Sequence, residues 1–249
     1  MHFGKNIIRF ERLDSTNKKA RELQKDKDLP EGSIVICHEQ YAGRGYGTNE
    51  WESAAGMNIT ATWILKPFFL KADEQFAITK AVSLAVSETV KYFYKGELPV
   101  TIKWPNDIYV KNQKIAGILV ENNIMGNDIR DCFAGIGLNI NQEVFYSDAP
   151  NPVSLKVLTG SNFDTNTCIN LLSENLQKYY YQLRESGPDA LNDKYKNSLY
   201  RLGELSEFVS MGTNLQGTIV GTDSYGRLEV KLKTGEKKVF DFKEISFVI

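Results

Sequence analysis

The sequence has few of the residues that usually carry acid–base, nucleophilic or metal chemistry. Its 249 residues include only two histidines, His2 and His38, and His2 lies at the N-terminus. A metal site built on three histidines is therefore excluded, and a serine hydrolase would depend on His38 alone, with no G-x-S-x-G motif beside it. An enzyme of this composition works mainly by positioning its reactants and by electrostatic stabilisation.

Cysteine, net charge and long apolar runs are scarce as well. The three cysteines are an odd number and far apart, which argues against a disulfide framework and against a Cys-rich zinc site. Lys and Arg (30) nearly balance Asp and Glu (31), so there is no electrostatic footprint for nucleic acid or an anionic membrane. No run approaches the ~20 apolar residues of a membrane span. We therefore expect a cytoplasmic protein that binds neither nucleic acid nor membrane.

Hydrophobic patterning predicts an α+β fold in two parts. Residues 1–200 are expected to form a mixed sheet with helices packed on it, and residues 201–249 a small β-barrel of five short strands. The expected helices are 18–24, 72–95, 165–186 and a further one ending near 200. The expected strands of the first part are 7–10, 33–37, 57–65, 100–104, 108–110, 115–120 and 133–139.

A glycine-rich loop covers residues 40–51. Gly43, Gly45 and Gly47 let backbone N–H groups approach an anion, and Arg44 supplies a cation. Such a loop suits a nucleotide or an acyl phosphate, but a plain hairpin tip explains the glycines equally well.

Three further segments combine polar residues with strand ends. In 103–107 (Lys-Trp-Pro-Asn-Asp), Pro105 ends a strand so that its neighbours can converge, although Asn106 alone could simply form a turn. Lys114 lies in the turn before the apolar strand 115–120. Most lysines in such a position are simply solvated. Gly117, and the glycines of 135–139, mark either a bulge or the close approach of a ligand or a second backbone.

Together these segments resemble the biotin protein ligase family. The matching motifs are D-S-T-N at 14–17, a loop similar to G-R-G-x-x-G-x-x-W at 43–51, K-W-P-N-D at 103–107, K-I-A-G-I-L-V-E at 114–121 and G-I-G-L-N at 135–139. The family implies a catalytic domain of the class II aminoacyl-tRNA-synthetase type, followed by an SH3-like domain. Because D-S-T-N begins at residue 14, we expect the class without an N-terminal DNA-binding domain.

The resemblance implies a two-step reaction. Biotin and ATP, with Mg²⁺ held mainly by phosphates and by no protein side chain in particular, give biotinyl-5′-AMP. A lysine of a biotin carboxyl carrier protein domain then takes the biotinyl group. The ligase would act as a monomer or a homodimer, and its barrel, with seven basic and seven acidic residues, would close over ATP or dock the carrier.

The resemblance also implies roles for individual residues. Trp104 is expected in the core, and the carboxylate of Asp107 is expected to orient the acceptor lysine. The expected catalytic residues are Arg44, Lys103, Asp107 and Lys114. The expected biotin-binding residues are Ser15, Thr16, Asn17, Gln40, Gly43, Arg44, Gly45, Tyr46, Lys114 and Gly117. The expected ATP and adenylate contacts are Arg44, Trp51, Asn106, Lys114 and Asn139.

The glycine loop departs from the family pattern. Tyr46 stands where Arg is frequent, and residues 47–49 replace an Arg-Gly-Arg-like stretch, so Arg44 is the only cation in the loop. We expect weaker retention of the adenylate as a result. Two other functions remain open: a lipoate ligase or octanoyl transferase of the same fold, and a degenerate, non-catalytic biotin-binding module.

Overall fold

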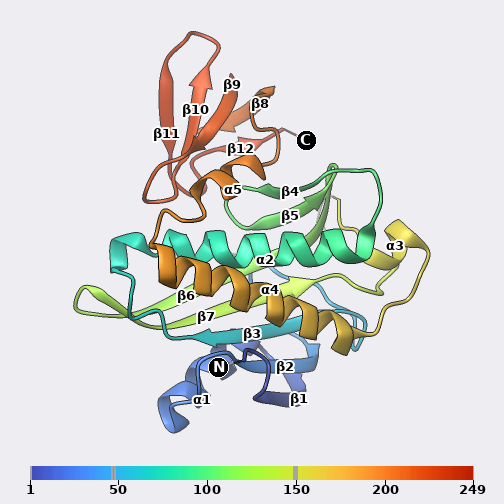
Figure 1. Cartoon of the computed structure of the whole chain (residues 1–249). Coiled ribbons are helices and arrows are strands. Elements are labelled where there is room, and N and C mark those ends of the chain that lie inside the picture. Colours follow the sequence, from blue (N-terminus) through green and yellow to red (C-terminus); the bar gives the residue numbers. More distant parts are fainter. Residues whose placement is uncertain (1, 46, 48, 148–150, 249) are drawn as a thin grey trace.

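The computed structural model describes residues 2–45, 47, 49–147 and 151–248, and it contains two sheets (Figure 1). In the larger one, β1 and β2 are parallel and all other neighbours are antiparallel, so the sheet is mixed, as expected. Its strands in spatial order are β1 (Ile7–Leu13), β2 (Ser33–Gln40), β3 (Ile59–Leu65), β7 (Asp128–Leu138), β6 (Gln113–Met125), β5 (Asp107–Val110) and β4 (Val100–Lys103).

Helices cover both faces of this sheet. Successive side chains of a strand point to opposite faces. On β3, Trp63 donates its indole N–H to Ser173 of α4 (Thr165–Ser186), at 3.1 Å, whereas the next side chain towards the N-terminus, Thr62, contacts α1 (Thr16–Lys27). The large core lies under α4 and α2 (Phe76–Tyr94), and a smaller core lies under α1. Figure 1 shows α2 and α4 side by side across one face.

The C-terminal sheet has five antiparallel strands, the number that the sequence predicts. It comprises β8 (Leu205–Ser210), β9 (Thr213–Thr222), β10 (Leu228–Leu232), β11 (Lys237–Phe240) and β12 (Ser246–Phe247). Among the described residues the order is β11-β10-β9-β8-β12, and no pairing between β11 and β12 closes it into a barrel. We call residues 205–247 the C-terminal sheet.

Several elements differ from the expected ones. The helix expected over 72–95 is divided into a short 3₁₀ turn, η1 (Ala72–Glu74), and α2. The helix expected to end near 200 is only α5 (Asn192–Asn197), and α3 (Leu155–Thr159), capped by Ser154, was too short for periodicity to predict. Strands β6 and β7 extend beyond the expected ranges 115–120 and 133–139. The sequence analysis missed their outer halves because these are rich in polar residues. No helix in the described ranges combines the length and apolarity needed to cross a membrane.

Trp104 joins the two sheets. Its side chain is 4% exposed, which confirms the expected core position, and its indole N–H donates to the carbonyl of Gly226 in the C-terminal sheet at 2.7 Å. Its ring lies 5.2 Å from that of Phe242. The Trp104 side chain therefore helps to fix the C-terminal sheet against the strand that leads to Asn106 and Asp107.

Replacing Trp104 by Phe should lower the free energy of unfolding by about 2–3 kcal/mol, because it leaves a buried carbonyl without a donor and removes packing. Urea unfolding measures this. Tyr92→Phe, which removes an exposed hydroxyl, is the control and should change little. A loss below about 0.5 kcal/mol for Trp104→Phe would show that the Gly226 contact does not hold the sheets together.

Candidate active site

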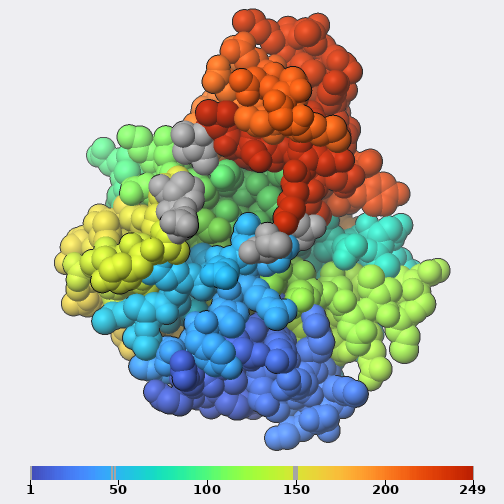
Figure 2. All heavy atoms as spheres, turned by 180° about the vertical axis from the view of Figure 1, so that it is seen from behind, coloured from blue at the N-terminus to red at the C-terminus, as the bar shows by residue number. Residues whose placement is uncertain are grey.

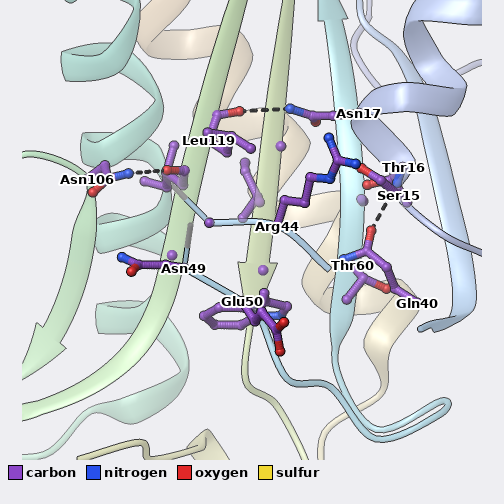
Figure 3. Close-up of a pocket in the computed structure, with 18 of the residues that line it drawn as sticks. Ser15, Thr16, Asn17, Gln40, Arg44, Asn49, Glu50, Thr60, Asn106 and Leu119 are labelled. Atoms are coloured by element: carbon purple, nitrogen blue, oxygen red, sulfur yellow. Dashed lines mark hydrogen bonds between the residues drawn. The ribbon is translucent and has the colours of Figure 1, made fainter. Parts of the chain in front are cut away.

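A cavity brings the predicted segments together at one end of β2, β6 and β7 (Figure 3). Eleven of its lining residues belong to the site that the sequence predicts: Ser15, Thr16, Asn17, Gln40, Arg44, Gly45, Trp51, Asn106, Asp107, Lys114 and Gly117. Thr60, Asn49 and Glu50 line it as well and were not predicted. Gly43 lies in the wall of a neighbouring hollow, and Tyr46 lies outside the described residues.

The N-terminus of α1 forms one end of the cavity. Ser15 is the N-cap, and the backbone N–H of Thr16 donates to Oε1 of Gln40, the last residue of β2, at 2.9 Å. The Thr16 hydroxyl lies 2.9 Å from that of Thr62 on β3. A helix N-terminus carries a partial positive charge, so this end favours polar acceptors on a ligand even though the N–H of Thr16 already has a partner.

Asn17 is held more firmly than its neighbours. Its Oδ1 accepts from Thr62 at 2.6 Å, and its Nδ2 donates to the carbonyl of Leu119 and to the carboxylate of Glu121. A Cβ at Gly135 would lie 2.4 Å from Oδ1 of Asn17, so the glycine is needed for this approach. The Asn17 amide thus fixes α1 to the sheet. Its hydrogen bonds to the protein orient it before a ligand binds.

The glycine-rich loop folds back on itself. The N–H of Gly45 donates to the carbonyl of Asn49 at 2.7 Å, and that of Trp51 to the carbonyl of Gly43 at 2.9 Å. A Cβ at Gly43 would lie 2.5 Å from the Trp51 carbonyl oxygen, which excludes larger residues there. Figure 3 shows the Arg44 side chain extending towards Ser15 and Thr16. The loop therefore directs its cation into the cavity.

Trp51 lies on two facing glycines of the sheet. Gly117 of β6 and Gly137 of β7 are partners in the ladder, and a Cβ on Gly137 would overlap the indole ring. The Trp51 Nε1 atom is buried and has no hydrogen-bond partner among the described residues. The predicted close approach at Gly117 is therefore made by an aromatic side chain of the protein itself.

Two predicted catalytic groups form an ion pair. Nζ of Lys114 lies 2.7 Å from Oδ1 of Asp107, and both side chains are partly exposed to the cavity. The same Nζ lies 5.7 Å from the centre of the Trp51 ring. Asn106 is fixed beside them, because its Nδ2 donates to the carbonyl of Ile118 at 2.6 Å.

Glu52, which the sequence analysis missed, holds the segment that follows the loop. Its carboxylate accepts from the backbone N–H groups of Tyr146 and Ser147 and from Nε2 of Gln142. Although burial raises its pKa, these hydrogen bonds outweigh burial and lower the pKa of Glu52 below its usual value. The only sequence signal for this role was the position of Glu52 directly after Trp51. Its partners lie about 90 residues further along the chain, so the sequence did not indicate them.

Two predicted residues are not brought to the cavity. Nζ of Lys103 lies 3.2 Å from the Tyr109 hydroxyl and 5.3 Å from the centre of the Phe247 ring in the C-terminal sheet. Burial lowers its pKa. Asn139 is 2% exposed and donates to the carbonyl of Val153, while its Oδ1 is buried without a partner among the described residues. Lys103 faces the junction of the sheets, and Asn139 lies behind the cavity.

Metal ligands are few in this cavity. No group of three or more His, Cys, Asp or Glu side chains capable of holding a metal occurs in the part of the chain that the structure describes. The carboxylates of the cavity are those of Glu50 and Asp107.

Known proteins resemble this chain over nearly its whole length. It is 28% identical over 243 residues to the bifunctional ligase/repressor BirA of Bacillus subtilis, which covers 95% of this chain and 73% of the relative. It is 29% identical over 241 residues to the biotin–[acetyl-CoA-carboxylase] ligase of Paracoccus denitrificans, covering 95% of this chain and 98% of that protein.

Solved structures share the fold. The biotin protein ligase of Aquifex aeolicus in complex with biotin and ATP superposes with a TM-score of 0.79 at 23% identity, over 97% of this chain and 98% of that one. A family model describing the biotin/lipoate A/B protein ligase family matches residues 9–139, more than half of the chain and nearly all of its larger sheet. The chain therefore belongs to the biotin/lipoate A/B protein ligase family.

Proposed function

We propose that this chain is an ATP-dependent ligase that activates biotin as biotinyl-5′-AMP and transfers it to a lysine of a biotin carboxyl carrier protein domain. The observation that carries the proposal is one cavity in which Arg44 and Lys114 meet the N-terminus of α1 and the ring of Trp51. The likeness to the Paracoccus ligase along nearly its full length supports the same activity.

The first step brings two anions together. A carboxylate oxygen of biotin attacks the α-phosphorus of ATP, an anhydride bond forms, and pyrophosphate leaves. Arg44 and Lys114 reduce the repulsion between carboxylate and phosphate, while Gln40 and the start of α1 orient the polar head of biotin. Trp51 offers an aromatic face to adenine.

In the second step an uncharged lysine amine of the carrier attacks the biotinyl carbonyl, an amide bond forms, and AMP leaves. Asp107 forms an ion pair with Lys114 and is partly exposed to the cavity, so its carboxylate is available to the lysine of an incoming carrier. Its negative charge would orient the acceptor lysine beside the anhydride.

A magnesium ion fits this site only together with the nucleotide. Mg²⁺ usually takes one or two carboxylates and several oxygens of phosphate and water. Glu50 and Asp107 supply that number of carboxylates here. When bound, the ion would neutralise phosphate charge.

The cysteines support a cytoplasmic setting for the enzyme. Cys37, Cys132 and Cys168 are all buried free thiols, and burial raises the pKa of each. Such thiols suit a reducing compartment, which supports the proposal that the enzyme acts in the cytoplasm.

One experiment tests the function directly. Biotin should support exchange of labelled pyrophosphate into ATP, and the chain should then label a biotin carboxyl carrier domain. Lys114→Met should lower the exchange rate by about 100-fold or more, since one side chain contacting the reacting phosphate is lost. Exchange that depends on lipoate or octanoate instead would reassign the substrate. Biotin binding without any exchange would favour a non-catalytic binding module.

Replacing Asp107 by Asn should separate the two steps. With biotinyl-AMP supplied ready-made, transfer to the carrier domain should fall by about 100-fold, because the charge that orients the amine is lost. The measurement is the single-turnover transfer rate. Asp128→Asn, which breaks an exposed ion pair with Lys71 far from the cavity, is the matched control. Full-rate transfer by Asp107→Asn would remove Asp107 from this role.

Adding one methyl group at Gly137 should impair ATP binding selectively. Because its Cβ would overlap the Trp51 ring, Gly137→Ala should raise KM for ATP about five- to tenfold and leave KM for biotin nearly unchanged. Gly160→Ala, which has open space around it but strains a φ of 73° away from the cavity, controls for general destabilisation and should leave both KM values unchanged. Equal effects on both substrates would contradict a role for the ring in nucleotide binding.

A further inference from the structure

The C-terminal sheet places a lysine against the glycine-rich loop. A Cβ built on Gly47 would overlap Nζ of Lys243, and it would lie 2.7 Å from Cε of that lysine. Gly47 and Lys243 are both exposed, so the contact lies at the mouth of the site. In Figure 2 the red end of the chain extends from the C-terminal sheet down to the light-blue surface around residue 50.

Lys243 is held there by contacts of its neighbours in the chain, which do not depend on its own side chain. Phe242 packs on Trp104 and Phe76 and lines a hollow with Asn106, next to the cavity. The N–H of Glu244 donates to the carbonyl of Asp241, which closes a four-residue turn. The turn is therefore anchored on the catalytic part of the chain, and Lys243 projects from it.

Lysine is an unusual residue at this position of the turn. Its φ of 70° lies in the left-handed region, which glycine or asparagine adopts most easily at the third position of such a turn. A non-glycine residue there carries a conformational cost. The cost would be offset by a function of the ammonium group at the glycine-rich loop that it contacts.

The loop itself lacks the charge that this lysine brings. Arg44 is its only cation, glycine stands at 47, and Asn49 and Glu50 follow. Arg44 lines both the inner cavity and the outer hollow, whereas Gly47 lines only the outer hollow, whose other charged side chains are those of Glu39, Glu50 and Glu52. Because the outer hollow shares Arg44, Asn49 and Trp51 with the inner cavity, the polyphosphate of an ATP molecule bound in the inner cavity would meet a cation at Gly47 where it extends into the outer hollow.

We infer that Lys243 binds the β- and γ-phosphates of ATP, and the pyrophosphate that leaves, so that a residue of the C-terminal sheet completes the nucleotide site of the Arg-poor loop. The inference rests on the proposed function, since it assumes that ATP occupies the cavity. Biotin and the adenylate, which have neither phosphate, do not depend on Lys243.

The test uses pyrophosphate itself as the probe. Lys243→Met should weaken the binding of magnesium pyrophosphate to the full chain about tenfold in calorimetry, and raise KM for ATP by a similar factor, as expected for one charge-assisted contact. KM for biotin and transfer from ready-made biotinyl-AMP should stay at the wild-type values, which also shows that the variant folds. Lys238→Met, on β11 of the same sheet, is the matched control.

Two further variants sharpen the result. Lys243→Gly removes the charge but suits the turn, so it should weaken pyrophosphate binding as much as Lys243→Met without lowering Tm. Asn49→Arg added to Lys243→Met should restore binding by returning a cation to the loop. Unchanged pyrophosphate affinity in Lys243→Met and Lys243→Gly overturns the inference. A wild-type chain that binds pyrophosphate but catalyses no exchange would instead overturn the proposed function alone.

Discussion

The site depends on a strip of sheet that carries no side chains. Gly135 and Gly137 of β7 and Gly117 of β6 share one face, while their neighbours Ala116, Ile136 and Leu138 point to the core beneath α2 and α4. The bare strip lets two groups approach the backbone: the Asn17 amide over Gly135, and the Trp51 ring over Gly117 and Gly137. The first fixes α1 and its N-terminus, and the second fixes the end of the glycine-rich loop. The two ends of the cavity are therefore positioned by absent side chains on two adjacent strands.

Electrostatics complements this arrangement. The cavity has no histidine and no cluster of acidic residues in its described wall, so it is poorly suited to proton shuttling or to a dedicated metal. It offers instead the guanidinium of Arg44, the ammonium of Lys114 and the positive end of the α1 dipole. Such fixed positive groups are what a reaction between a carboxylate and a phosphate requires. Asp107 pairs with Lys114, so a phosphate bound by Lys114 would exchange one anionic partner of this lysine for another.

Much of this could be predicted from the sequence because the information is local. The strands and helices carry clear periodicity, and the residues of the motifs lie at strand ends or at a helix N-cap, where chain order already implies convergence. Lys103 shows the limit: it belongs to the same motif as Asp107, yet its amine lies between Tyr109 and Phe247, because the C-terminal sheet covers that side. Glu52 and Lys243 could not be predicted, since their contacts join segments that are far apart in the chain. The packing of Phe242 on Trp104 and Phe76 brings the turn of Lys243 to the loop.

The division of the positive charge among elements has a consequence for how the two sheets work together. Arg44 comes from a loop, Lys114 from a strand of the larger sheet, and Lys243 from the C-terminal sheet. A loop rich in arginine would carry the polyphosphate contacts by itself and would keep them whatever the C-terminal sheet did. If Lys243 binds the polyphosphate as inferred above, that contact requires the packing of Phe242 on Trp104 and Phe76, so nucleotide binding and the packing of the two sheets would be thermodynamically linked. Ligand that binds across the junction stabilises it, and a weakened junction lowers affinity for ATP before it affects biotin.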